Sequence, residues 1–112
     1  MTNKNFNIII TGVGGQGLIT LVSIIDEAAF IEGHDVKSSE LHGLSQRGGS
    51  VLAHIRFGKK VYSPLVSHGS ADLIMGLEIL EGLRGAVFAG QKTKFLINKY
   101  SLSFIGGLPE KE

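Results

Sequence analysis

The first part of the chain shows a strand pattern, then a helix pattern, then a second strand pattern. Phe6–Thr11 is short, apolar and β-branched, and Gly12 ends it, which is typical of a parallel strand buried on both faces. Leu18–Glu32 carries apolar residues at helical spacing, with Gly33 as its expected C-cap. Asp35–Ser39 is a weaker second strand. Together these segments predict a β-α-β unit whose crossover is right-handed.

The predicted helix has more apolar residues than a single buried face requires. Four large side chains widen the apolar face beyond the helical stripe: Ile19, Ile24, Phe30 and Ile31. We therefore expect this helix to be covered on one side by a sheet and on another by a partner.

The middle of the chain predicts a β-hairpin. Leu41–Gly49 is polar and rich in glycine, so we expect a loop or a single turn there. Ser50–Phe57 alternates between apolar and polar residues, as a strand with one more exposed face does. Gly58-Lys59 is the expected turn, and Lys60–Ser63 is the expected returning strand, which Pro64 stops.

A second β-α-β unit follows the predicted hairpin. Ala71–Leu77 has the pattern of a buried strand, Glu78–Ala89 that of a helix, and Thr93–Asn98 that of a last strand. The tail, Tyr100–Glu112, has no clear period. The whole pattern predicts one α/β domain over residues 1–112: a mostly parallel sheet, helices on both faces and an antiparallel hairpin insertion.

Composition excludes several classes of protein. With 112 residues, 43% of them hydrophobic and 19% charged, the chain has the size and composition of one globular domain. The absence of cysteine excludes a disulfide framework, a cysteine nucleophile and an iron–sulfur cluster held by this chain. A net charge of +1 gives no nucleic-acid footprint. The sequence shows no targeting signal, so we expect a cytoplasmic protein. We also expect that it does not enter the membrane, because glycines and polar residues interrupt the uncharged run Phe6–Ile25.

A Gly-x-Gly-x-x-Gly motif lies between the first strand and the helix. Gly12 would permit the tight turn, Gly14 would let a phosphate approach the backbone, and Gly17 would let the helix pack on the strand. The following helix N-terminus offers free N–H groups to an anion. The alternative is a tight strand-to-helix turn that binds no ligand.

The dinucleotide interpretation of this motif needs an acidic residue at the end of the second strand. Glu40 is the candidate, but it comes slightly late, and Ser38 and Ser39 occupy the usual place. No Gly-Lys-Ser/Thr follows the glycines, which excludes a P-loop. An NAD site is therefore a weakened alternative.

A second candidate segment follows the second strand. His42-Gly43-Leu44-Ser45-Gln46-Arg47-Gly48-Gly49 would lie beside the glycine loop, at the edge of the sheet where ligands of parallel sheets bind. Its polar side chains offer donors for a phosphate, carboxylate or carbonyl group. The alternative is a solvated loop whose arginine pairs locally.

Other titratable residues carry weaker signals. His34, His54 and His68 lie on different elements without clustered acids, so we expect no metal site. Glu78 and Glu81 share one side of a helix at a spacing of three, which usually marks a solvated face. No nucleophile motif is present, and we assign no catalytic residue.

Three segments in this order resemble a known family. Thr11–Gly17, Glu40–Val51 and Val61–Pro64 are similar to the gamma-type subunits of 2-oxoacid:ferredoxin oxidoreductases, with most similarity to the beta subunits of indolepyruvate ferredoxin oxidoreductases. The likeness runs from about Asn7 to Asn98, which is most of the chain.

The resemblance implies a Rossmann-like three-layer fold and a subunit that is inactive alone. Enzymes of this family cleave a 2-oxoacid oxidatively, here indolepyruvate or another aryl pyruvate, transfer the acyl group to coenzyme A as co-substrate and reduce ferredoxin. Thiamine diphosphate and iron–sulfur clusters would lie in a large partner subunit. The resemblance further implies a shared site lined by eight residues of this chain: Gly12, Gly14, Gly15, Gln16, Gly17, Ser45, Gln46 and Arg47.

The resemblance also has a departure, and alternatives remain open. Subunits of this family are considerably longer, and the family pattern decays at Lys99, so we expect the domain to be incomplete at its C-terminus, with a last strand that lacks helix cover. Alternative functions are a stand-alone nucleotide-binding Rossmann-like domain, an adenylating enzyme of the ubiquitin-activating type, and an inactive remnant or interaction module.

Overall fold

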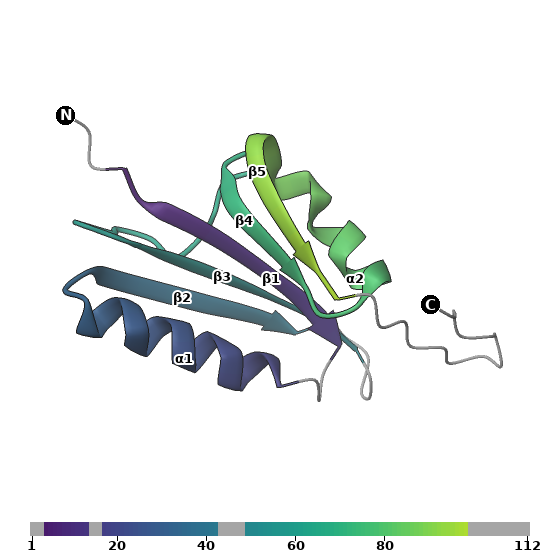
Figure 1. Ribbon diagram of the computed structural model, residues 1–112, viewed down its shortest axis with the longest axis horizontal. Helices are drawn as coiled ribbons and strands as arrows, with labels where there is room; N and C mark the ends of the chain where they lie inside the picture. The colour runs from purple at the N-terminus through teal and green to yellow at the C-terminus, as the bar shows by residue number, and fades with distance from the viewer. Residues whose placement is uncertain (1–3, 14–16, 43–48, 99–112) are drawn as a thin grey trace, which may run out of the picture.

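A computed structural model describes residues 4–13, 17–42 and 49–98 of the chain (Figure 1). The elements are, in chain order, β1 (Phe6–Val13), α1 (Leu18–Ile31), β2 (Asp35–His42), β3 (Ser50–Gly58), β4 (Ala71–Gly76), α2 (Ile79–Arg84), the short 3₁₀ helix η1 (Gly85–Phe88) and β5 (Ala89–Ile97). The strands form one five-stranded sheet in the order β2-β3-β1-β4-β5. The pairs β1–β4 and β4–β5 are parallel, whereas β3 runs antiparallel to both β1 and β2.

The sheet is the middle of three layers. Helix α1 covers one face, where Leu18 and Val22 pack against Ile8 and Ile10 of β1. Helix α2 and η1 lie on the opposite face (Figure 1), where Phe88 packs with other buried apolar residues. The α/β three-layer architecture and the mixed parallel and antiparallel sheet confirm the predicted fold class.

Strand β1 is the centre of the core, as its apolar run predicts. Ile9 and Ile10 point to opposite faces of the sheet, and neither has any exposed surface. Burial of two isoleucines on two faces explains why the run is continuously apolar rather than alternating. The strand therefore anchors both helical layers.

The predicted hairpin of Ser50–Phe57 with Lys60–Ser63 is wrong. Strand β3 instead pairs on one side with β1 and on the other with β2, so neither of its edges is left for Lys60–Ser63. The later segment has other partners for its backbone: Val61 N–H donates to Asp35 Oδ2 at 2.8 Å, and Ser63 carbonyl oxygen accepts from Arg56 Nη1 at 2.9 Å. The antiparallel insertion is thus β3 itself, placed between β1 and β2.

Three element boundaries also differ from the prediction. Strand β2 continues to His42, because its last residues pair with the start of β3. Helix α2 ends at Arg84 and is followed by η1. At Gly85 the backbone lies so close to the sheet that a Cβ atom there would be 2.9 Å from Ile74 Cγ2. This close approach brings the chain down onto the sheet, and β5 consequently begins at Ala89 instead of Thr93.

Large apolar side chains are exposed on the outer surfaces of α1 and β5, the two elements for which the sequence predicts uncovered apolar residues. On α1 the exposed large apolar side chains are Ile19, Ile24, Phe30 and Ile31. On β5, Phe95 and Leu96 point to opposite faces and are 51% and 59% exposed. Within the described residues, Phe95 and Leu96 therefore lack cover, whereas Ile97 at the end of the strand lies against Gly82 of α2.

Candidate functional site

The described ends of both predicted binding segments meet at one edge of the sheet. Val13, the last residue of β1, is the register partner of Ser50, the first residue of β3. His42, the last residue of β2, is the register partner of Val51. This is the end of the sheet where β1 and β2 terminate, and we call it the carboxyl edge (Figure 1). Both the glycine loop and the segment after β2 therefore start from this edge, as the sequence predicts.

Two of the eight predicted site residues are described. Gly17 is the N-cap residue of α1 and has φ 80°, a left-handed conformation that favours glycine. Gly12 is not in a tight turn, which corrects the role predicted for it: β1 continues to Val13, and Gly12 pairs with Val51 inside the ladder. The other six lie outside the described residues, and their roles stay predictions: Gly14, Gly15, Gln16, Ser45, Gln46 and Arg47.

A pocket of about 200 Å³ opens at the same edge, between the strands and α2. We call it the carboxyl-edge pocket. It is lined by Thr11, Leu41, His42, Ser50, Val51, Leu52, Glu81 and Arg84. Its walls are mainly apolar, whereas Thr11, Ser50 and Glu81 supply oxygen atoms. The pocket thus combines apolar surface with buried oxygen atoms, next to the described ends of both predicted binding segments.

Glu81 is the central polar residue of the carboxyl-edge pocket. Its side chain is almost fully buried, and its Oε2 atom accepts from Ser50 Oγ at 3.0 Å and pairs with Arg84 Nε at 3.1 Å. Helix α2 fixes the backbone of Glu81, because Glu78 is the N-cap and its Oε1 accepts from Glu81 N–H at 2.6 Å.

The prediction that Glu78 and Glu81 form a solvated face is wrong. Both residues are buried, at 3% and 5% exposure. A short helix that packs on the face of the sheet against β1 and β4 buries its first turn, which helical spacing alone does not reveal. The signal that could have found them is position: Glu78 directly follows a buried strand, and Glu81 is three residues later, the spacing of an N-cap and its N3 partner.

The acidic residue proposed for a dinucleotide is not beside the glycine motif. Glu40 lies inside β2, where its Oε1 is 3.8 Å from His42 Nε2. Strand β3 separates β2 from β1, so two strand spacings, about 10 Å, lie between Glu40 and the strand that leads into the glycine loop. Ser38, at the more usual place, donates to Asp26 Oδ2 at 2.7 Å. The topology therefore does not support the dinucleotide alternative.

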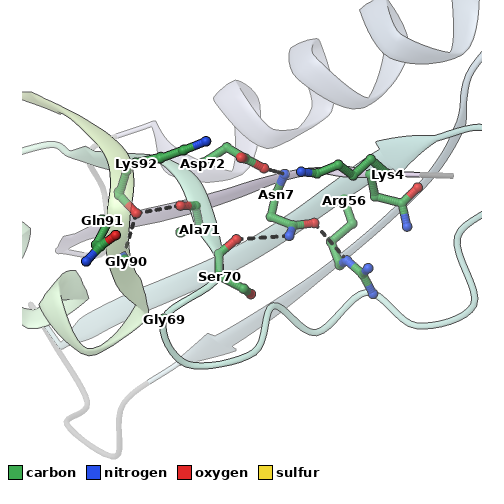
Figure 2. A pocket seen from close by; sticks show the side chains of 12 residues that line it. Lys4, Asn7, Arg56, Gly69, Ser70, Ala71, Asp72, Gly90, Gln91 and Lys92 are labelled. Atoms are coloured by element: carbon green, nitrogen blue, oxygen red, sulfur yellow. Dashed lines mark hydrogen bonds between the residues drawn. The ribbon is translucent and has the colours of Figure 1, made fainter. Parts of the chain in front are cut away.

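A larger pocket of about 580 Å³ lies at the opposite edge, where β1, β4 and β5 begin. Figure 2 shows Asn7 at its centre. Asn7 donates from its backbone to Asp72 Oδ2 at 2.8 Å and from Nδ2 to Ser70 carbonyl oxygen at 3.0 Å, and its Oδ1 accepts from Arg56 Nε at 2.9 Å. These polar groups satisfy one another and tie three strands together. The network accounts for Asn7, Arg56, Ser70 and Asp72 as structure, whereas the Oδ1 atom of Asn5, which also lines the pocket, is buried without a hydrogen-bond partner among the described residues.

The family follows from a match over nearly the whole chain. A model of the pyruvate ferredoxin/flavodoxin oxidoreductase family matches residues 7–111. The chain belongs to this family. The match continues past Asn98, so the expectation that the family pattern decays at Lys99 is wrong.

Two relatives from this family are indolepyruvate oxidoreductase subunits named IorB. The protein of Thermococcus kodakarensis is 49% identical over 81 residues, which is 72% of this chain and 40% of that protein. The protein of Archaeoglobus fulgidus is 46% identical over 92 residues, which is 82% of this chain and 45% of that protein. The chain thus spans less than half the length of these relatives.

The fold recurs in a solved enzyme. A 2-oxoglutarate:ferredoxin oxidoreductase from Magnetococcus marinus, solved with 2-oxoglutarate, coenzyme A and succinyl-CoA, matches 95% of this chain with a TM-score of 0.75 and 19% identity. The match covers 18% of that much longer chain. At this identity the likeness shows a shared fold.

In the part of this pyruvate ferredoxin/flavodoxin oxidoreductase domain that the structure describes, two kinds of feature are absent: a metal-ligand cluster and a membrane-spanning helix. Among residues 4–13, 17–42 and 49–98, no three histidine or acidic side chains gather as metal ligands would. In the same residues, no helix has both the length and the apolar character needed to span a membrane.

Proposed function

We propose that this chain is a non-autonomous subunit of a thiamine diphosphate-dependent 2-oxoacid:ferredoxin oxidoreductase. The observation that carries the proposal is the 49% identity to an indolepyruvate oxidoreductase subunit over most of this chain. The same relative favours indolepyruvate or another aryl pyruvate as the 2-oxoacid. In the proposed reaction the acyl group passes to coenzyme A and the electrons pass to ferredoxin.

The proposed division of labour follows from the chemistry of the chain. An iron–sulfur cluster is held by cysteine thiolates, and the sequence contains no cysteine. We therefore assign the clusters to a large partner subunit. We further propose that the same subunit binds thiamine diphosphate and that the complex lies in the cytoplasm. This chain would contribute the carboxyl edge of its sheet to a site shared between subunits, with the glycine loop and Ser45, Gln46 and Arg47 as the contributing segments.

Coenzyme A is the proposed co-substrate at this edge. The solved relative in fold carries coenzyme A, and a phosphate-bearing ligand suits a glycine-rich loop that ends at a helix N-terminus. Gly17, in its left-handed conformation, fixes the direction in which α1 leaves the loop. None of the described residues is assigned a proton-transfer step.

The test is anaerobic co-purification followed by reconstitution. Tagged chain should retain a large, brown partner from which thiamine diphosphate can be released. The complex should reduce a viologen dye with indolepyruvate and coenzyme A, and the chain alone should show no turnover. A colourless eluate of this chain alone, or turnover by the isolated chain, would overturn the proposal. The first result would favour the alternative of an inactive remnant.

A further inference from the structure

The larger pocket, at the end of the sheet where β1, β4 and β5 begin, carries an excess of positive charge. We call it the amino-edge pocket. Four charged side chains line it: Lys4, Arg56, Asp72 and Lys92. Three cations and one carboxylate leave a net charge of +2. The volume of about 580 Å³ lies in the range of about 300–1,000 Å³ that is usual for whole small-molecule ligands.

The guanidinium group of Arg56 keeps its charge, because its partners are neutral. It donates to Asn7 Oδ1 and to the Ser63 carbonyl oxygen, both at 2.9 Å. Lys37, the register partner of Arg56 on β2, pairs with Asp35 at 3.8 Å. Because this neighbouring ion pair is neutral as a unit, it leaves the charge of the amino-edge pocket unchanged.

Lys4 and Lys92 extend toward the same part of the amino-edge pocket. Figure 2 shows their side chains directed toward Asp72 from either side. Among the described residues neither lysine forms an ion pair, and Asp72 Oδ2 accepts the backbone N–H of Asn7. One carboxylate between two ammonium groups leaves one positive charge there, and Arg56 supplies the second. An anion that enters the pocket is therefore attracted by unbalanced charge.

The hydrogen-bonding groups of the pocket favour the same kind of ligand. Three acceptors in the central network are already in use: Asn7 Oδ1, Asp72 Oδ2 and the Ser70 carbonyl oxygen. The lysine ammonium groups offer only donors. Asn5 Oδ1 is a buried acceptor without a partner among the described residues, but it lies against Gly58 and carries no charge. The available donors and the net charge together select a ligand with anionic oxygen atoms, such as a phosphate or a carboxylate.

Two contacting turns hold the walls of the amino-edge pocket. Gly69, before β4, has φ 78°, and its carbonyl oxygen lies where a Cβ on Gly90 of β5 would have to go. Thr93 Oγ1 accepts the Gly90 N–H at 2.7 Å and donates to the Ala71 carbonyl oxygen. Lys92 lies between these bonded residues, so its backbone is held in place without a ligand. Such pre-organisation lowers the cost of binding.

We propose that the amino-edge pocket binds a small hydrophilic organic anion through a phosphate or carboxylate group. The anionic group lies beside Lys4 and Lys92, and Arg56 supplies the third positive charge. The pocket is larger than one such group requires, and its amide and hydroxyl lining suits a polar body. The proposal does not rest on the proposed function, because this pocket lies at the opposite end of the strands from the carboxyl edge.

The test compares three salts on the full chain at equal ionic strength: sodium phosphate, sodium citrate and sodium chloride. The readout is the set of backbone amide resonances in solution. We expect saturable shifts at Ser70, Asp72 and Lys92 with phosphate, citrate or both, and none with chloride. Saturation with phosphate alone would indicate an organic phosphate, and saturation with citrate alone a polycarboxylate. Shifts that rise without saturation in all three salts, or that saturate only elsewhere, would overturn the proposal.

Two lysines of β5 form a matched pair of variants. Lys92→Gln should weaken anion binding by about fivefold, the upper end for one exposed charge pair. Lys94→Gln removes an equally exposed charge from the same strand but outside the pocket, and binding should stay unchanged. Equal weakening by both variants would mean that the anion senses only the overall charge of the protein, and the site would be rejected.

Asp72→Asn gives the opposite expectation. It removes the carboxylate of the pocket and keeps an amide oxygen that can accept the Asn7 N–H. Anion binding should therefore tighten by about fivefold. Weaker or unchanged binding in a variant whose melting temperature matches that of the parent chain would show that charge in this pocket does not select the ligand.

Discussion

Val66 donates its backbone N–H to Nδ1 of His54 at 3.0 Å, which fixes His54 as a neutral acceptor inside the α2 face of the sheet. The ring also meets Phe88 edge-on at 5.4 Å. Burial lowers the pKa of His54 below its usual value of about 6.5, because the charged form loses solvation. Protonation would in addition remove the acceptor that Val66 uses.

Stability should therefore fall as the pH drops below about 6.5, the pKa of His54 in the unfolded chain. In that range the unfolded chain takes up a proton that the folded chain does not. His54→Asn keeps an acceptor near the Nδ1 position and should flatten this part of the pH profile of the melting temperature. His68→Asn is the matched control, since its exposed ring contacts the same Phe88. A profile that stays steep in His54→Asn would contradict the assignment.

Asp35 should produce a separate loss of stability at lower pH. The Val61 N–H bond to Oδ2 lowers the pKa of Asp35 below 3.8. A carboxylate with a lowered pKa contributes stability above about 3.8, and that stability is lost as the pH falls through the folded pKa. Asp35→Asn should remove this acid step and leave the His54 step unchanged. Urea titrations at a series of pH values would resolve the two, and a single step that both variants share would argue against separate origins.

Gly76 and Gly82 allow α2 to lie directly on the end of β4. A Cβ on Gly76 would be 2.6 Å from Gly82 Cα, a backbone atom that cannot move aside cheaply. A Cβ on Gly82 would be 2.6 Å from Ile97 Cδ1, the tip of a flexible side chain. Gly76→Ala should destabilise the domain by about 2 kcal/mol or more, as overpacking does. Gly82→Ala should be near neutral, because alanine gains about 1 kcal/mol in a helix. Equal losses measured by chemical denaturation would mean that the helix can shift.

The accuracy of sequence reasoning in this chain depended on how local each feature is. Phe6–Thr11 and Leu18–Glu32 were predicted well, because burial on both faces and a helical stripe are written in adjacent residues. The hairpin at Lys60–Ser63 was wrong because the choice of partner for β3 is a long-range matter. The alternation of apolar and polar residues in Ser50–Phe57 predicts a strand but does not indicate which strand lies beside it.

The candidate site was predictable in its place but not in its chemistry. The glycine motif and the segment after β2 pointed to the carboxyl edge, and the described ends of both segments meet there. Glu81 was missed because its burial depends on α2 docking against this edge, and its partner Ser50 is remote in sequence. The order of β2, β3 and β1, which separates Glu40 from the glycine loop, likewise follows from tertiary pairing.

The strand order makes a last prediction about nucleotides. A dinucleotide site of the usual kind needs its acidic residue on the strand next to β1, and here that neighbour is β3 instead of β2. NAD should therefore show no saturable binding to the chain up to millimolar concentration, and Glu40→Ala should change nothing in the titration. A dehydrogenase that binds NAD serves as the positive control for calorimetry. Micromolar binding that Glu40→Ala weakens would restore the dinucleotide alternative and would require the glycine loop to reach across β3.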